Sequence, residues 1–500
     1  MRIAVYLCTR AAEKGVFLPG YIFTMFRKER DKLIHQYKNN GYNIVLDVNS
    51  GSVHVVDDIV YDVIACMVEN NLENADKAAA LKILGEKFAD KTEELSELVD
   101  EIYELKEDGM LFTEDIYEKS IDAFKNRETV VKALCLHIAH DCNLKCRYCF
   151  AEEGEYHGRR ALMSYEVGKK ALDFLVANSG SRVNLEVDFF GGEPLMNWQV
   201  VKDLVAYGRS LEKPHNKKFR FTLTTNGVLL NDDIIEFANK EMANIVLSVD
   251  GRKEVNDKMR PLAGGQGSYD IIMPKFKKVA ESRNQTNYYV RGTFTHFNKD
   301  FAADVCHLAD MGFQQISVEP VVAPENEDYA LVEADIPELL AEYDKLAAEM
   351  IKRHKEGRGF NFFHFMIDLK GGPCVYKRLS GCGSGTEYLA VTPWGDFYPC
   401  HQFVGQEQFL MGNVDTGITN TDIREEFKAC NVYSKEKCKN CFAKFYCSGG
   451  CAANSYNFHG NINDAYDLGC ELQRKRVECA IMIKAALAEE EEKAPGRSGQ

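Results

Sequence analysis

The sequence lacks any long apolar stretch. No run within its 500 residues approaches the roughly 18 apolar residues that a helix needs to cross a bilayer. The opening segment, residues 1–32, also lacks the ordered basic, apolar and small-residue regions of a secretory signal peptide. We therefore expect a cytoplasmic protein that has no membrane partner.

Positive charge is also in short supply. The chain has 61 lysine and arginine residues against 76 aspartate and glutamate residues, which gives a formal net charge of -15. A general nucleic-acid binder needs a basic face for the phosphates, so we expect no nucleic-acid partner. Hydrophobic residues at 45% and charged residues at 27% are ordinary for a globular protein, and the length allows about two to four domains.

Cysteine, by contrast, is plentiful, and three cysteines stand close together. Cys142, Cys146 and Cys149 form the spacing CxxxCxxC directly after an apolar run at 134–139, so a strand is predicted to deliver three thiolates into one loop. A [4Fe-4S] cluster normally takes four cysteines, and a structural zinc site takes four ligands. A three-cysteine site therefore borrows a fourth ligand or leaves a position open for another molecule. Three buried thiols near a turn are the alternative without function.

Strand and helix patterns alternate through the middle of the chain. The predicted strands are 134–139, 183–190, 219–225, 245–250, 288–295 and 316–319, and the predicted helices are 165–177, 199–211, 232–239, 269–281, 300–311 and 337–355. Six such units predict an α/β fold with a parallel sheet curled into a partial (β/α)6 barrel. The site of such a barrel lies at the carboxyl ends of its strands, which is where the three cysteines stand.

Glycines and polar residues end several of the other strands. They are Gly191, Gly192, Glu193 and Pro194 after the second strand, Thr224 and Asn226 at the third, and Ser248 and Asp250 at the fourth. Glycines let the backbone approach a ligand, while carboxylate and carbonyl oxygens accept hydrogen bonds from an ammonium group. Arg260 and Arg291 are both candidates for a charge-assisted contact, and the sequence does not decide between them.

The region before the barrel has its own pattern. Its predicted elements are two hairpin strands at 42–48 and 52–56 and three helices at 59–69, 77–88 and 93–105. We predict a winged-helix-like unit at 38–112, with a plain helical cap as the alternative. Residues 1–37 carry no clear periodicity, and we interpret them as a leader that is partly disordered or lies upstream of the natural start.

The last part of the chain is rich in cysteine. Cys438, Cys441, Cys447, Cys451 and Cys470 follow the spacing C-x2-C-x5-C-x3-C-x18-C, and Cys374, Cys382 and Cys400 stand upstream. Five thiols in one segment exceed the four that a single tetrahedral zinc takes, although a pair of zinc ribbons would also fit. We predict a barrel at 113–360, a metal-binding domain at 361–482 and a solvated tail at 483–500.

These motifs together resemble the radical S-adenosylmethionine (SAM) superfamily. The CxxxCxxC spacing with an aromatic residue, Tyr148, before its last cysteine resembles that family's cluster motif, and residues 191–194 resemble its GGEP motif. The resemblance implies that the three cysteines hold a [4Fe-4S] cluster whose open iron binds SAM, and that reduction cleaves SAM to a 5′-deoxyadenosyl radical. It also implies that Ser248 contacts the SAM carboxylate and that the other strand-end residues line the cofactor site.

The later cysteines resemble the seven-cysteine SPASM domain, which holds two auxiliary [4Fe-4S] clusters in many radical SAM enzymes. The implied ligands are Cys438, Cys441, Cys447 and Cys470 for a distal cluster and Cys382, Cys400 and Cys451 for a proximal one. Cys374 is the implied fourth proximal ligand unless that cluster keeps an open iron. Three [4Fe-4S] clusters and SAM are therefore the expected cofactors.

Within the superfamily, residues 42–48, 381–383 and 398–403 resemble the SCIFF peptide maturases. These enzymes form Cys-to-Thr thioether cross-links in a small cysteine-rich ribosomal peptide. The N-terminal unit resembles the element that captures a peptide leader by adding a strand to a sheet edge. Such a peptide and an external low-potential electron donor are the implied partners. The alternatives are an anaerobic sulfatase maturase that forms formylglycine, an iron-sulfur electron carrier and a zinc-stabilised binding module.

Overall fold

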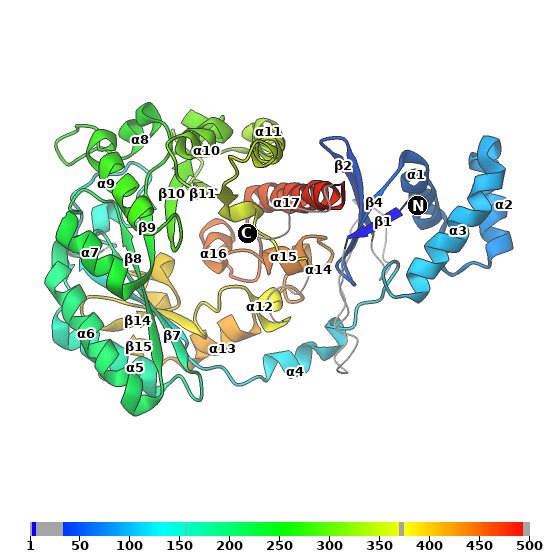
Figure 1. The fold of residues 1–500 in the computed structure, drawn as a ribbon. Helices are drawn as coiled ribbons and strands as arrows, with labels where there is room; N and C mark the ends of the chain where they lie inside the picture. Colours follow the sequence, from blue (N-terminus) through cyan, green and yellow to red (C-terminus); the bar gives the residue numbers. More distant parts are fainter. Residues whose placement is uncertain (1–2, 7–33, 157, 370–374, 494–500) are drawn as a thin grey trace.

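The computed structural model of this chain describes residues 3–6, 34–156, 158–369 and 375–493. A four-stranded sheet lies near the N-terminus, and a second sheet of twelve strands runs from the middle of the chain into its C-terminal part. Figure 1 shows the two sheets on opposite sides of the long helix α17 (Asp467–Lys493). Among the helices in these ranges, none combines the length and apolarity that a membrane crossing requires.

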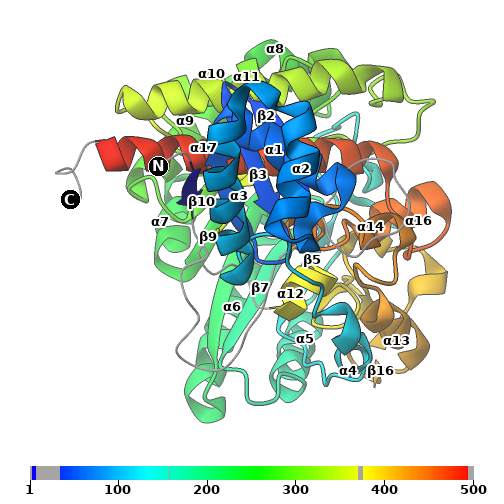
Figure 2. The same ribbon diagram turned by 90° about the vertical axis from the view of Figure 1, so that its right-hand side faces the viewer.

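The first sheet is antiparallel and has the strand order β1-β4-β3-β2. Its strands are β1 (Ile3–Tyr6), β2 (Ile34–Asn39), β3 (Tyr42–Asp47) and β4 (Ser52–Val56), and the helices that follow are α1 (Asp58–Asn70), α2 (Lys77–Lys87) and α3 (Thr92–Glu107). The predicted hairpin and three predicted helices are therefore confirmed. Figure 2 shows the helices stacked over this sheet.

Two strands of this sheet were not predicted. Both β1 and most of β2 fall within the supposed leader 1–37, and β2 crosses the predicted boundary at residue 38. The sequence of β2, IHQYKN, does not predict a strand, because only Ile34 and Tyr37 are apolar. The polar residue Asn39 is buried as well. The remaining leader residues, 1–2 and 7–33, lie outside the described ranges.

Asp47 is a buried carboxylate at the end of β3. It accepts hydrogen bonds from Ser50 N at 2.9 Å, from Thr113 N at 3.0 Å and from Thr113 Oγ1 at 2.6 Å. Burial outweighs these donors and raises the pKa of Asp47 to about 6. Because the folded protein then binds this proton more tightly than the unfolded chain does, the contribution of Asp47 to stability falls as the pH rises from about 4 to about 6.

We expect this effect to disappear in Asp47→Asn. Between about pH 4 and about pH 6, the free energy of unfolding of the wild type should decline by up to about 3 kcal/mol more than that of the variant. Urea unfolding of both proteins at the two ends of this interval measures the difference. Equal pH slopes for the two proteins would contradict the assignment.

The second sheet contains the six predicted parallel strands. They pair in the order β5 (Ala133–His140), β7 (Asn184–Gly191), β8 (Lys218–Thr225), β9 (Met242–Ser248), β10 (Tyr288–Phe294) and β11 (Gln315–Pro320), with β12 (Asn361–Phe362) beside β11. The helices between them are α5 (Tyr165–Ala177), α6 (Trp198–His215), α7 (Asp232–Glu241), α8 (Lys253–Met259), α9 (Tyr269–Ser282), α10 (Phe301–Asp310) and α11 (Ile336–Lys355). The predicted α/β fold with a partial barrel is confirmed.

The barrel sheet continues past β5 into the C-terminal part of the chain. Strand β13 (Tyr388–Val391) pairs with β5 in parallel, and the short strand β6 (Ala161–Leu162) pairs with the end of β5. Beyond β13 the sheet continues through β14 (Asp396–Tyr398), β15 (Gly412–Asn413) and β16 (Gly417–Ile418). The remaining helices are α4 (Ile121–Lys125), α12 (Val375–Ser380), α13 (Thr421–Ala429), α14 (Glu436–Lys439), α15 (Lys444–Cys447) and α16 (Ala452–His459). The predicted division near residue 361 is therefore not a break in the sheet.

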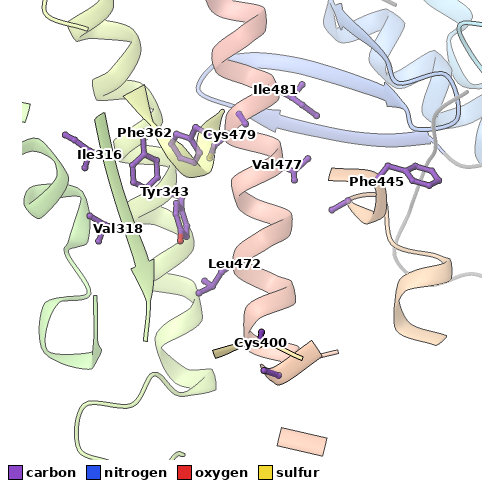
Figure 3. Packing of buried hydrophobic residues seen from close by; sticks show 14 of the residues in the cluster. Ile316, Val318, Tyr343, Phe362, Cys400, Phe445, Leu472, Val477, Cys479 and Ile481 are labelled. Atoms are coloured by element: carbon purple, nitrogen blue, oxygen red, sulfur yellow. The ribbon is translucent and has the colours of Figure 1, made fainter. Parts of the chain in front are cut away.

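Helix α17 joins the two bodies. It packs against α11 and against β2. Figure 3 shows Leu472 directed toward Tyr343 on the barrel side, while Val477 and Ile481 lie on the other face of the helix. On that side Tyr37 of β2 donates a hydrogen bond from its hydroxyl to a main-chain carbonyl of α17, at 3.0 Å. The N-terminal sheet is thus held against the rest of the molecule.

The predicted solvated tail at 483–500 is wrong for its first part. Helix α17 continues to Lys493, and Ala485 and Ala486 are buried. The acidic run that suggested a tail is confined to the end of the helix. The apolar turns before it are packed against the protein and belong to the same helix. Residues 494–500 lie outside the described ranges.

Candidate active site

The loop after β5 is held by the last residue of α8 and by the segment that follows it. Lys145 N donates to Pro261 O at 2.9 Å, and Arg147 N donates to Met259 O at 2.9 Å. These two backbone hydrogen bonds flank Cys146 on both sides. The middle cysteine of the triad is therefore fixed in position by main-chain atoms.

The three thiols share one pocket of about 160 Å³ at the carboxyl ends of β5, β7, β8 and β9. The sequence-predicted residues that line it are Cys142, Cys146, Tyr148, Cys149, Gly191, Gly192, Thr224, Asn226, Ser248 and Arg260. Residues that sequence analysis missed also line it: Leu144, Phe150, Ala151, Gly154, Tyr156, Phe190 and Thr225. Phe150 and Thr225 could have been found because they adjoin predicted residues, whereas Tyr156 had no signal.

Burial dominates the electrostatics of the triad. It is the main cause that raises the pKa of Cys142 to about 12 and that of Cys146 to about 11, and the neighbouring cysteines act in the same direction. Thiols of this kind keep their protons until a metal displaces them. Within the described ranges, no three His, Cys, Asp or Glu side chains converge as ligands of a single metal ion would. A [4Fe-4S] cluster makes no such demand, because each cysteine binds a different iron.

Gly191 and Gly192 bring the end of β7 against the chain that leaves β5. A Cβ on Gly191 would lie 2.3 Å from Ala139 O, and a Cβ on Gly192 would lie 2.2 Å from Asp141 O. Gly192 N also donates to Ala139 O at 2.7 Å. The glycines thus allow a close approach between two backbone segments, which sets the position of the residue before Cys142, while the predicted approach to a ligand stays a prediction.

Glu193 does not line the pocket but ties two strand-end loops together. Its carboxylate is fully buried and accepts hydrogen bonds from Thr225 Oγ1 at 2.8 Å, Asn226 N at 2.8 Å and Leu195 N at 3.0 Å. Burial raises its pKa. The structure thus gives this carboxylate a structural role, and its expected contact with a ligand ammonium group stays a prediction. Asn226, held in this way, does reach the pocket.

Tyr148, Asp250 and Arg260 form a buried chain beside the triad. The Tyr148 hydroxyl lies 2.7 Å from each carboxylate oxygen of Asp250, and Arg260 Nη1 donates to that hydroxyl at 2.9 Å. Burial raises the pKa of Asp250 to about 6. Asp250 itself does not line the pocket, and neither does Pro194, which is buried at the start of a 3-10 helix (Pro194–Asn197).

The structure separates the two candidate arginines. Arg260 lines the pocket, and its Nε is buried without a hydrogen-bond partner. Arg291 lies exposed on β10 and pairs with Glu319 at 3.0 Å, away from the pocket lining. A ligand carboxylate would satisfy the unpartnered Nε of Arg260, so the residues present fit a carboxylate-bearing cofactor.

We expect Arg260→Gln to weaken SAM binding by about tenfold to a hundredfold, because a buried hydrogen bond to a charged group contributes about 1.5–3 kcal/mol. Arg291→Gln is the matched control and should keep the wild-type affinity. Equilibrium dialysis with labelled SAM measures both. Equal losses in the two variants, or a loss in Arg291→Gln alone, would contradict the assignment of Arg260.

Four of the C-terminal cysteines lie in one group. They are Cys438, Cys441, Cys447 and Cys470. Cys441 and Cys470 add to the effect of burial on the pKa of Cys438 and of Cys447, and Cys441 adds to it for Cys470. Burial alone is the larger cause, and the resulting pKa is about 12 for Cys438 and Cys447 and about 11 for Cys470. These are the four positions expected for the distal cluster.

Three further cysteines form a second group. Burial, with smaller contributions from Cys451 and Cys382, raises the pKa of Cys400 to about 12. Residues 448–450 join this group to the first, and all three have positive φ angles, of 61°, 85° and 73°. Cys374, the expected fourth member, lies outside the described ranges.

Comparisons with known proteins agree with this geometry. Residues 136–300 match the family model of the radical SAM superfamily. The cysteine-type anaerobic sulfatase-maturating enzyme of Clostridium novyi is 26% identical over 66% of this chain and 90% of its own length. The radical SAM cyclopropyl synthase TigE of Paramaledivibacter caminithermalis is 22% identical over 69% of this chain and 72% of its own.

A solved structure has a similar fold. Native anSMEcpe with bound AdoMet and Kp18Cys peptide has a TM-score of 0.58 and 18% identity, and the match covers 72% of this chain and 99% of that one. The partial barrel, the three-thiol pocket and the family match together identify residues 136–300 as a radical SAM domain, in a chain that is similar to the anaerobic sulfatase-maturating enzymes.

Proposed function

We propose that this enzyme forms thioether cross-links between cysteine and threonine in a small, cysteine-rich ribosomal peptide. The observation that carries the proposal is the N-terminal sheet with helices α1–α3, held on α17 through β2. A sheet edge can bind an extended peptide by adding a strand. The match to anSMEcpe covers nearly all of that chain but 72% of this one, which leaves room here for an additional peptide-holding unit.

The chain's own residues prepare the pocket for this reaction. Cys142, Cys146 and Cys149 would hold a [4Fe-4S] cluster, which when reduced supplies the electron that cleaves SAM to a 5′-deoxyadenosyl radical. Arg260 binds the carboxylate of SAM, while Tyr156 shields the pocket from water. Tyr156 is 2% exposed and donates a hydrogen bond to the main chain of β7 at 3.1 Å, so its ring is held in place.

Thioether formation needs an electron acceptor as well as a radical. A carbon–hydrogen bond and a sulfur–hydrogen bond break and a carbon–sulfur bond forms. The carbon loses its hydrogen atom to the 5′-deoxyadenosyl radical, the thiol proton goes to solvent, and one electron must leave. The two C-terminal cysteine groups would hold auxiliary [4Fe-4S] clusters, whose chemistry includes accepting one electron. An external donor of low potential supplies the electron for SAM cleavage.

Formylglycine formation on a sulfatase is the second candidate, and the similarity to the Clostridium novyi enzyme favours it. The two candidates differ in the mass change of their substrates. Anaerobic incubation with SAM, a reductant and a peptide that is rich in cysteine and encoded beside this gene should yield peptide lighter by two hydrogens for each cross-link. Mass spectrometry of fragments should then locate cysteine–threonine pairs. Turnover of a sulfatase-derived peptide, with no mass loss in the cysteine-rich one, would favour formylglycine formation.

A further inference from the structure

Lys435 carries a positive charge into the interior of the C-terminal region. Its side chain is 2% exposed, and its Nζ donates to Gly449 O at 2.9 Å. A lysine ammonium has three donors, and the carbonyl of Gly449 takes only one. In the part of the chain that the structure describes, no carboxylate forms an ion pair with it. Burying an ammonium group without an anion costs free energy of folding, so negative charge near Lys435 would stabilise the protein.

Gly449 lies in the connection between the two cysteine groups. Cys447 belongs to the first group and Cys451 to the second, and residues 448–450 between them all take the left-handed conformation. Through Gly449, the ammonium of Lys435 therefore holds the loop that places one cysteine of each group. A substitution of Lys435 would therefore affect the positions of cysteines in both groups.

Lys435 is also tied to the start of the first group. Its main-chain carbonyl accepts a hydrogen bond from Cys438 N at 2.9 Å. Burial raises the pKa of Cys438 and of Cys451, and the charge of Lys435 opposes that rise in both. One cation thus stabilises thiolate charge in each of the two groups.

We propose that Lys435 is a shared electrostatic residue of the two auxiliary cluster sites, which raises the reduction potential of both clusters so that they accept the electron released during cross-linking. The inference rests on the proposed function, because the clusters belong to it. Net charge and the polar surroundings of the sulfurs set the potential of an iron-sulfur cluster. A fixed cation between two cysteine-bound clusters stabilises their reduced, more negative state.

The test uses the full chain with Cys142, Cys146 and Cys149 replaced by alanine, so that any remaining iron belongs to the auxiliary sites. After anaerobic cluster reconstitution, a redox titration followed by electron paramagnetic resonance gives their midpoint potentials. Lys435→Met should make reduction at least tenfold less favourable, which is about 59 mV for one electron. Lys278→Met is the matched control, because Lys278 is half exposed, pairs with Asp232 and lies on α9 of the barrel rather than in either cysteine group. It should leave the potentials unchanged.

Iron content separates the remaining outcomes. Full iron with unchanged potentials in Lys435→Met would overturn the inference alone. If Lys435→Met loses auxiliary iron, Lys435→Arg should keep both the iron and the potentials because it keeps the charge; loss in both variants would overturn the role of the charge. If the triple-alanine parent holds no iron at all, both this inference and the assignment of the auxiliary clusters fail.

Discussion

Replacing Cys142, Cys146 and Cys149 together by alanine should abolish SAM cleavage, to the background of a reaction without protein. The three thiols line one pocket, and the partial barrel brings Arg260 and Ser248 to the same place. Without the thiolates no cluster can be held there, so the electron needed for cleavage has no route to SAM. Chromatographic assay of 5′-deoxyadenosine measures this. If the two proposed auxiliary clusters are present, the iron content should fall by about one third, because they would be retained.

Cys306→Ala is a suitable control for this variant. Cys306 lies on α10 and belongs to none of the three cysteine groups. It should keep the wild-type iron content and the wild-type rate of SAM cleavage. If the triple variant cleaves SAM at the wild-type rate, the triad is not the site of the cluster.

Gly192→Ala should weaken SAM binding by about tenfold to a hundredfold. An added Cβ would lie 2.2 Å from the carbonyl oxygen of Asp141 and 2.7 Å from its carbonyl carbon. Backbone atoms cannot rotate away as a flexible side chain can, so the loop must move, and Cys142 moves with Asp141. Overpacking of this kind costs about 1–3 kcal/mol, which sets the size of the expected loss.

Gly85→Ala is the matched control for added volume. Gly85 lies in α2, and a Cβ there meets nothing within 4 Å. This variant should bind SAM like the wild type and should be more stable by up to about 1 kcal/mol, since alanine favours helix. Equilibrium dialysis gives the affinities, and thermal unfolding shows whether each variant is folded. Wild-type affinity in folded Gly192→Ala would show that the approach of the β7 end does not position the site.

The barrel could be predicted because its sequence pattern is local. Each of the six strands is an apolar run that ends in glycine or polar residues, and each helix has one apolar face, so spacing alone places the strand ends together. The same logic located the triad, Thr224 and Ser248 at one pocket. Lining residues such as Tyr156 could not be predicted, because the sequence around an aromatic residue in a loop does not show whether its side chain faces a pocket or the core.

Long-range contacts were the part that sequence could not supply. Strand β2 is polar along most of its length and is held by its neighbours and by α17 rather than by its own pattern. The carboxylate of Glu193 gave no sign in the sequence of its structural partners, because two of its three donors come from residues 225 and 226, at the end of the next strand. Likewise, the pairing of β13 with β5 joins segments more than two hundred residues apart.

The most direct test of the central claim is the transfer of deuterium from the peptide to SAM-derived product. The cysteine-rich peptide is made with deuterium on the carbons of its threonines and incubated anaerobically with the enzyme, SAM and a reductant. The account predicts 5′-deoxyadenosine that carries deuterium, together with a peptide that has lost that deuterium and gained a thioether to cysteine. Unlabelled 5′-deoxyadenosine and a peptide of unchanged mass would contradict it.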